Sequence, residues 1–372
     1  MIKQNQYFPQ SWPHPGETLE EKLQEMGMGP KEFAIRTGKP EKTIIAVLKG
    51  DSALTPDMAL QFESVTKIPA HFWMNSQRSY DEFVAREKRK EIIAQSVGWA
   101  RLFPKSHMIK KEWLPVSSSI EQKTTELLSF FSISSPAAWQ DYYINQKLKV
   151  AFRISLAHTN EPYAISAWLR KGELQAAELP SIPYSEKRFK EILPDIKTLM
   201  AGQPSDFSLQ LQAICLKAGV KVVYTPSLPK APINGSTRWL NDTPFIQLTG
   251  KYKRNDAFWF TFFHEAGHIL LHGKKDIFLE NIEYPDKIND KELEADSFAI
   301  KWTLSEDEEK EVLKATPLNE EKVRAFAHKF NTHPSIIIGR LQHKGYLPTA
   351  FGRELFEPIM LEDIKPELKR VS

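Results

Sequence analysis

The pentapeptide His264-Glu-Ala-Gly-His268, set in the apolar stretch FWFTFFHEAGHILLH, constrains the fold more than any other feature of the chain. On an α-helix, two histidines at this spacing lie on one face, about 6 Å apart along the axis, and both rings can reach one Zn²⁺ at about 2.0 Å. Glu265 then lies beside the metal, where it can deprotonate a zinc-bound water and pass the proton to a leaving amine. The motif therefore predicts a helix with a catalytic zinc site. The alternative is a pair of surface histidines on a helix.

A zinc site needs a third protein ligand, and the segment KELEADSFAIKW offers carboxylates at helical spacing. Glu292 and Asp296 lie on one helical face, so that Glu292 can bind zinc while Asp296 hydrogen-bonds a ligand histidine. Glu294 lies on another face and is the fallback ligand, although a solvated charge is its simpler role.

His272 is a less suitable ligand. It follows His264 by eight residues, which places it about 12 Å along a continuous helix, outside the same tetrahedron. We expect His272 at the helix C-terminus, near the free carbonyls, or behind a ligand histidine as its hydrogen-bond partner.

The chain after about residue 205 alternates between helix and strand patterns. LQLQAICLKAGV predicts a helix ended by glycine, whereas KVVYT and PFIQLT have the β-branched and aromatic content of strands. We therefore expect residues 205–372 to form an α+β domain with a small sheet beside the buried HEAGH helix, followed by C-terminal helices.

Residues 205–345 contain KAGVKVVYTPSLPKAPINGSTRWL, PFIQL, FWFTFFHEAGHILLHGKK and ELEADSFA, which together resemble the ImmA/IrrE family of zinc metallo-endopeptidases. The family has HExxH on one helix and E-x-x-A-[ND]-x-F-A on the next, and every chemical position of the pattern is matched by His264, Glu265, His268, Glu292, Ala295, Asp296, Phe298 and Ala299. The resemblance implies a zincin-like fold, bound Zn²⁺ and a protein substrate. It also implies a sheet edge at INGSTRWL or DTPFIQL that pairs with an extended peptide. Arg238 would lie near the cleft and help an oxyanion, or would be a surface arginine.

Residues 17–85 have the pattern of a small helical domain. Gly27, Gly38 and Gly50 each end a helical stretch, and Thr55-Pro56 supplies an N-cap followed by proline at the first helical position. We assign residues 1–95 to this domain and expect the aromatic set Phe72, Trp73 and Tyr80 in its core.

The segment from His14 to Tyr80 opens with H-P-G-E, closes its third helix with L-K-G and ends in F-W-M-N-S-Q-R-S-Y. It resembles the HigA-type antidotes of the XRE helix-turn-helix family. The resemblance implies a homodimer that binds duplex operator DNA and, in some members, neutralises a toxin encoded beside it. A turn at Gly38–Pro40 would direct the helix Glu41–Leu48 toward a major groove.

The side chains of this expected recognition helix are a poor set of base readers. Only Lys42 and Thr43 suit base edges, Lys39 and Lys49 suit the phosphate backbone, and Glu41 repels phosphate. The alternative is a helix-turn-helix scaffold used for protein interaction or dimerisation.

Residues 96–204 carry no motif and are expected to form a mostly helical, ordered connector of unknown role that includes the strand-like LKVAFRIS.

Near the C-terminus, the segment VRAFAHKFNTHPSIIIGRLQHKGYL repeats the internal spacing of Phe33-Ala34, Ile44 and Leu48. It is either a second helix-turn-helix or a helical pair with similar core spacing.

The composition limits the compartment and the partners. The chain has 372 residues, 50 basic against 47 acidic side chains and one cysteine, Cys215, so disulfides and cysteine-based zinc fingers are excluded and any basic surface must be local. The sequence shows neither a signal peptide nor a transmembrane segment. We expect a multidomain cytoplasmic protein with no membrane partner.

Two functions are compatible with these patterns. The first is a transcriptional regulator of toxin-antitoxin or stress-response type whose zinc endopeptidase cleaves a regulatory protein, such as a repressor or a cognate toxin. The second is a DNA-binding antitoxin whose metal domain is a non-catalytic sensor or scaffold. Glu265 favours the first, because a scaffold needs metal ligands but no general base beside them.

Overall fold

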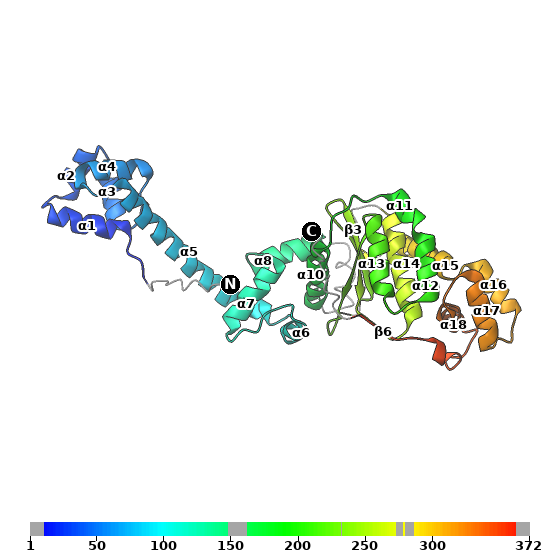
Figure 1. Cartoon of the computed structure of the whole chain (residues 1–372). Coiled ribbons are helices and arrows are strands. Elements are labelled where there is room, and N and C mark those ends of the chain that lie inside the picture. Colours follow the sequence, from blue (N-terminus) through cyan, green and yellow to red (C-terminus); the bar gives the residue numbers. More distant parts are fainter. Residues whose placement is uncertain (1–10, 148–161, 232, 273–277, 280–285, 362–372) are drawn as a thin grey trace. The chain divides into compact units, whose positions relative to one another are not determined.

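The computed structural model describes residues 11–147, 162–231, 233–272, 278–279 and 286–361 (Figure 1). The chain forms two compact units, Met1–Gln95 and Ser96–Ser372. Within the described ranges no helix is long and apolar enough to cross a membrane. The strand-like LKVAFRIS lies outside the described residues.

The first unit is helical, as expected. It contains α1 (Pro15–Glu25), α2 (Pro30–Thr37), α3 (Glu41–Leu48), α4 (Pro56–Thr66) and the start of α5 (Ala70–Ala100). Its core is formed by buried side chains from all five helices, among them Leu19, Phe33, Ile44, Phe62 and Trp73. Trp73 is core as predicted, and Tyr80 is half-buried, with its ring centroid 4.8 Å from that of His14. The expectation for Phe72 was wrong: the residue is 44% exposed, because it precedes Trp73 and lies on the outer side of α5.

The H-P-G-E sequence starts α1 and fixes it against α3. The Nδ1 atom of His14 accepts a hydrogen bond from the Gly16 N–H at 2.9 Å, and the Glu17 carboxylate accepts one from the His14 N–H at 2.9 Å, which completes a capping box. Gly16 lies directly against the carbonyl of Val47, since a Cβ at position 16 would be 2.0 Å from that oxygen. Only glycine fits there.

The turn between α2 and α3 is equally specific. Gly38 adopts a left-handed conformation with φ 66°, and the Lys39 N–H donates to the Ala34 carbonyl at 3.0 Å. This geometry ends α2 and lets α3 start within three residues, as a helix-turn-helix requires.

The second unit begins with helices and then adds a sheet. Its first helices, by residue range, are α6 (Lys105–Lys110), α7 (Ile120–Phe131), α8 (Pro136–Trp139), the π-helix η1 (Gln140–Lys147), α10 (Pro162–Glu178), α11 (Glu186–Glu191), α12 (Leu193–Gly202) and α13 (Phe207–Lys217). An aromatic cluster that includes Phe103, Phe131 and Trp139 holds the early helices together.

The sheet has the strand order β1-β3-β2-β5, with β1 (Lys221–Thr225), β2 (Gly235–Leu240), β3 (Thr243–Thr249) and β5 (Phe278–Leu279). β1 pairs with β3 in parallel, whereas β2 pairs antiparallel with β3 and with β5. β4 (Lys251–Tyr252) pairs separately with β6 (Ile359–Met360). The expectation that INGSTRWL or DTPFIQL forms the edge was wrong, because β2 and β3 are each hydrogen-bonded to a strand on both sides.

Helices cover both faces of the sheet (Figure 1). α10, from the segment expected to be a connector, packs on β1 and β3, where Ala176 and Leu179 contact Val223 and Phe245. α13 and α14 (Asn255–Leu271) cover the other face, where Val222 and Ile246 enter the main core. The expected α+β architecture after a helical N-terminal region is thus confirmed.

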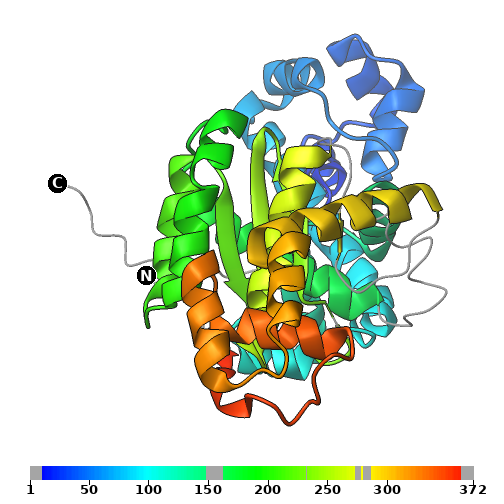
Figure 2. The same cartoon turned by 90° about the vertical axis from the view of Figure 1, so that its right-hand side faces the viewer.

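The chain after the sheet is helical: α15 (Asp286–Thr303), α16 (Glu306–Lys314), α17 (Glu320–Phe330), α18 (Pro334–His343) and the short 3₁₀ helix η2 (Arg353–Leu355). Figure 2 shows the orange C-terminal helices beside the yellow pair of α14 and α15. α14 packs against α15 and α18 as well as against the sheet, so nearly its whole surface is buried.

The α17–α18 pair has the turn geometry of α2–α3 but cannot read DNA in the same way. Asn331 is left-handed with φ 49°, and the Thr332 N–H donates to Ala327 at 3.0 Å. However, α18 buries most of its length from Ser335 to Leu341, packed against α14. The observed burial favours the reading of a helical pair with similar core spacing.

We predict that Gly16→Ala destabilises the first unit, because the added methyl group would overlap a backbone oxygen that cannot move without shifting α3. Overpacking of this kind costs about 1–3 kcal/mol. Hydrogen exchange of the full chain, followed by mass spectrometry, should show that α1 and α3 lose protection. Gly98→Ala is the control, because nothing lies within 4 Å of a carbon added there; equal protection in both variants would contradict the prediction.

Candidate metal centre

Helix α14 holds its polar residues in an apolar environment. His264, Glu265 and His268 are at most 3% exposed, because the sheet and α15 cover the faces that carry them. α15 approaches closely at Gly267, where a Cβ would lie 3.3 Å from the Cα of Ala295. Buried ionisable side chains need partners of opposite charge or a metal, and α15 supplies those partners.

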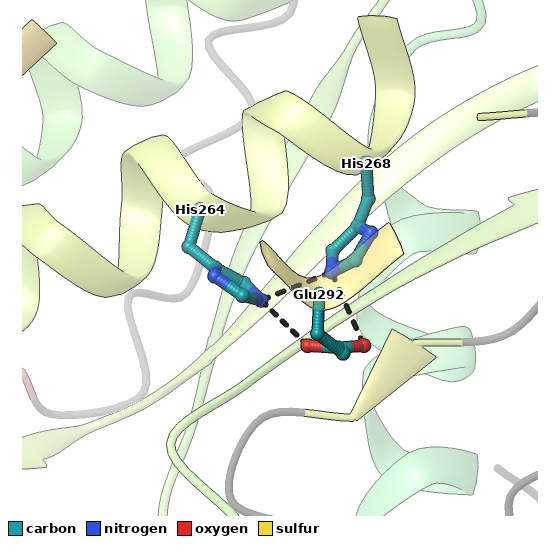
Figure 3. Close-up of side chains that lie close together, drawn as sticks. All are labelled: His264, His268 and Glu292. Carbon is teal, nitrogen blue, oxygen red and sulfur yellow. Dashed lines mark hydrogen bonds and ion pairs between the residues drawn. The ribbon is translucent and has the colours of Figure 1, made fainter. Parts of the chain in front are cut away.

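Three side chains converge on one point between α14 and α15 (Figure 3). The Nε2 atoms of His264 and His268 are 3.0 Å apart. The Glu292 carboxylate lies with Oε2 at 3.1 Å from the first and Oε1 at 3.6 Å from the second. One ligand atom from each residue falls within 4.8 Å of the others. We call His264, His268 and Glu292 the metal trio.

The donor set fits zinc. Two imidazole nitrogens and one carboxylate oxygen are the ligands that a catalytic zinc site takes, with a fourth position left open. The Oε1 atom of Glu292 is buried and accepts no hydrogen bond from the part of the chain that the structure describes. An acidic oxygen in this position suits a cation.

The outer nitrogens of the histidines are also held. Nδ1 of His264 is 2.9 Å from Oδ1 of Asp296, so the carboxylate accepts the N–H and leaves the Nε2 lone pair for a metal. Nδ1 of His268 is 2.9 Å from Nδ1 of His272, whose Nε2 is 3.0 Å from Oε2 of Glu294. The structure thus places Asp296 and His272 behind the two histidines.

His272 and Glu294 lie outside the trio. α14 ends at Leu271, and His272 is its extended C-cap, with φ −118°. The side chain of Glu294 is 63% exposed and contacts His272 instead of the trio. Of the two candidate carboxylates, Glu292 is the one that the structure brings to His264 and His268.

The metal-free trio is electrostatically coupled. Burial lowers the pKa of His264, but hydrogen bonds to Asp296 and Glu292 outweigh this effect and raise it to about 10. Burial lowers the pKa of His268 to about 4. Burial raises the pKa of Glu292, but its interactions with His264 and His268 outweigh this effect and lower the pKa to about 2. In the metal-free site, the positive charge of protonated His264 therefore balances the negative charge of Glu292. A metal that binds His264 must displace this proton.

Glu265 lies beneath the first residue of β2. It is fully buried, and a Cβ at Gly235 would be 2.7 Å from its Oε1 atom. The Thr237 hydroxyl donates to the Glu265 carbonyl at 2.9 Å and ties β2 to α14. Gly235 carries no sequence signal of this role, because the role depends on a strand and a helix that are distant in sequence.

Arg238 belongs neither to the cleft nor to the surface, so both expectations for it were wrong. It is 4% exposed, and it donates to Glu173 at 3.1 Å and to the Leu169 carbonyl at 2.7 Å. Side chains alternate along a strand, and because Thr237 faces α14, Arg238 faces α10.

The candidate DNA contacts lie on and beside α3. Lys42 and Lys49 are exposed and Thr43 is half-buried. The Nζ atom of Lys39 is 2.5 Å from Oδ2 of Asp57 on α4, so this lysine is partly neutralised. Lys42 and Lys49 are the cations of this group that solvent surrounds most fully.

Comparisons with known proteins match both ends of the chain. Residues 215–342 match the peptidase M78 family model, described as the IrrE N-terminal-like domain. The uncharacterized HTH-type transcriptional regulator YddM of Escherichia coli (strain K12) is 32% identical over 68 residues, which cover 18% of this chain and 72% of that protein.

Two solved structures also match. An addiction module antidote protein of the HigA family from Coxiella burnetii has 31% identity, over 22% of this chain and 91% of that chain, with a TM-score of 0.21. A putative antidote protein of a plasmid maintenance system from Nostoc punctiforme has 27% identity, over 23% of this chain and 92% of that chain, with a TM-score of 0.22. The family model and the match to YddM confirm the predicted resemblances to an IrrE-like peptidase domain and to helix-turn-helix regulators.

We predict that the purified chain binds one Zn²⁺ and that Glu292→Ala abolishes stoichiometric binding, because it removes the carboxylate ligand. Asp296→Asn should weaken zinc binding about 10- to 100-fold, the usual effect of losing a partner of a ligand histidine. Metal analysis with chelator competition measures both. Glu294→Ala is the matched control; loss of zinc in this variant, with retention in Glu292→Ala, would reverse the assignment.

Proposed function

We propose that the chain is a transcriptional regulator whose own zinc-dependent endopeptidase cleaves a regulatory protein. Through its N-terminal unit the chain belongs to the HTH-type transcriptional regulators. It also carries an IrrE N-terminal-like domain of the peptidase M78 family. The observation that carries the proposal is the convergence of the metal trio with Glu265 buried beside it. The substrate would be a repressor or a cognate toxin, in a toxin-antitoxin or stress-response system of the cytoplasm.

Each residue of the site has a role in this reaction. The metal trio would hold Zn²⁺, which when bound acts as a Lewis acid on the scissile carbonyl and lowers the pKa of a water molecule. Glu265 accepts a proton from the attacking water and delivers it to the leaving amine. Asp296 and His272 keep the histidines oriented, which favours the nitrogen lone pairs that point to the metal.

The environment of Glu265 supports its role as a base. Its carboxylate is fully buried and lies against Gly235 at the start of β2, so bulk water does not compete for the proton. Glu265 also directly follows a member of the trio on the same helix, which keeps base and metal at a fixed separation.

The N-terminal unit would bring the peptidase to operator DNA. α3 would enter the major groove with Lys42 and Thr43, while Lys39 and Lys49 contact phosphates. We further propose a homodimer, since operator-binding units of this family act on paired half-sites.

We predict that Glu265→Gln keeps its zinc but loses peptidase activity by about 10²-fold or more, because the amide cannot accept the proton. The assay is cleavage of peptides by zinc-loaded full chain, with zinc content measured in parallel. Glu294→Gln is the control, since that side chain lies outside the trio. Equal cleavage by wild type and Glu265→Gln would show that Glu265 is not the base.

We also predict that the full chain binds duplex DNA from its upstream region with strong salt dependence. Each phosphate contact contributes about 0.9 to the slope of log K against log salt, so Lys42→Ala and Lys49→Ala should each reduce the slope by about that amount. Lys39→Ala should have a smaller effect, because Asp57 already neutralises it. Fluorescence anisotropy at several salt concentrations measures the slopes.

Lys22→Ala is the matched control for these variants, because Lys22 lies on α1 and pairs with Glu25. Binding that is absent at low salt, or that does not change with salt, would instead support the use of this scaffold for protein interaction.

A further inference from the structure

A pocket of about 380 Å³ lies beside the metal trio, between α14, α15 and α18. Phe260, Ile300 and Ile336 give it apolar walls, and Arg340 of α18 supplies a cation. This volume is within the range of about 300–1,000 Å³ typical of ligand sites. It differs from the trio in that it offers a positively charged side chain instead of metal ligands.

The pocket adjoins the proposed reaction centre through shared residues. Asp296 lines the pocket and also holds His264 with its Oδ1 atom. Phe260 precedes His264 by one helical turn, and the two ring centroids are 6.5 Å apart. On its other side, the Phe260 ring lies 5.9 Å from the Arg340 guanidinium carbon. The pocket therefore adjoins the proposed reaction centre along α14, on the side of His264 that Phe260 and Asp296 cover.

The acidic residues of the pocket are already paired. Both oxygens of Asp256 accept hydrogen bonds from Arg254, at 3.0 and 2.8 Å. Asp296 is held by His264. The negative charge of Asp296 also acts on Arg340, whose pKa it raises against the lowering effect of burial.

Arg340, in contrast, keeps hydrogen-bonding capacity. Its side chain is only 12% exposed, and its buried Nη2 atom makes no hydrogen bond within the described ranges of the chain. Its Nε atom is 3.9 Å from Glu309, whose oxygens accept hydrogen bonds from Lys344 at 2.6 and 2.9 Å. A buried donor without an acceptor is costly, and burial lowers the pKa of Arg340. An incoming carboxylate would relieve this cost.

We propose that the Arg340 pocket is a specificity subsite that binds the acidic side chain, aspartate or glutamate, of a substrate residue next to the scissile bond. The methylene stem would pack on Phe260, Ile300 and Ile336, and the carboxylate would accept hydrogen bonds from the Arg340 fork. This inference rests on the proposed peptidase function. Arg340 would select the substrate and take no part in the chemical step.

The first test measures cleavage specificity. Zinc-loaded full chain is given a complex peptide mixture, the cleavage sites are read by mass spectrometry, and one cleaved acidic peptide is then compared with its glutamine counterpart. We expect wild type to favour the acidic peptide about 10- to 100-fold in kcat/KM, the range for a hydrogen bond to a charged group. Arg340→Gln should remove this ratio, whereas Arg340→Lys should keep part of it.

Arg324→Gln is the matched control, because Arg324 is an exposed arginine on the neighbouring α17 and should leave the ratio intact. An acidic preference that survives in Arg340→Gln, or a wild type that cleaves without any acidic preference, would overturn the inference and leave the peptidase proposal standing.

The second test is independent of cleavage. Arginine Nε–H signals of the metal-free full chain are recorded by NMR with glutarate and with its neutral counterpart glutaramide, and the Arg340 signal is assigned by its loss in Arg340→Gln. We expect glutarate alone to shift it. A shift in a chain that cleaves no peptide would support the carboxylate subsite while the peptidase proposal fails, and a signal that does not respond to glutarate would overturn the subsite.

Discussion

The fold of the second unit depends on how the buried ionisable side chains of α14 find partners for their charges. His264, Glu265 and His268 lie on a helix that is covered by the sheet, α15 and α18, and burying such groups without partners would cost several kcal/mol each. α15 supplies the partners Glu292 and Asp296, which lie one helical turn apart and contact His264 from two sides. The geometry of the site therefore depends on how closely α14 packs against α15. Small residues at the contact, Gly267 among them, let the two helices approach closely enough for the carboxylates to reach His264.

The sheet is positioned from its other face by a polar network. Arg238 on β2 pairs with Glu173 of α10 and donates to Gln247 on β3 at 2.6 Å, and Gln247 in turn donates to the Trp168 carbonyl at 2.7 Å. Because every member is buried and bonded, the network fixes the place of β2 between α10 and α14. The same strand carries Gly235 against Glu265. The helices before the sheet thus contribute to the position of the base, although none of their residues reaches the site.

The sequence was most informative where the chemistry depends on spacing within one helix. The four-residue spacings of His264 with His268 and of Glu292 with Asp296 define faces, and faces can be derived from helical geometry alone. The sequence was least informative where distant segments meet. The burial of Arg238, the central place of β3 and the pocket around Arg340 all depend on which element lies next to which. Phe260 had a local signal, its position one turn before His264, but that spacing alone cannot show which helix closes the pocket.

The burial of Glu265 bears on whether this domain is a catalyst or a scaffold. A scaffold would need the metal trio and its supporting partners, but it would need no carboxylate enclosed beneath β2. The fold nevertheless accommodates that carboxylate: position 235 has no side chain, since a Cβ there would press on Oε1, and the Thr237 hydroxyl holds the Glu265 backbone to the same strand. A buried carboxylate that directly follows one member of the metal trio on the same helix suits a group that accepts a proton at that point. The enclosure of Glu265 therefore favours the peptidase over the sensor, independently of the resemblance.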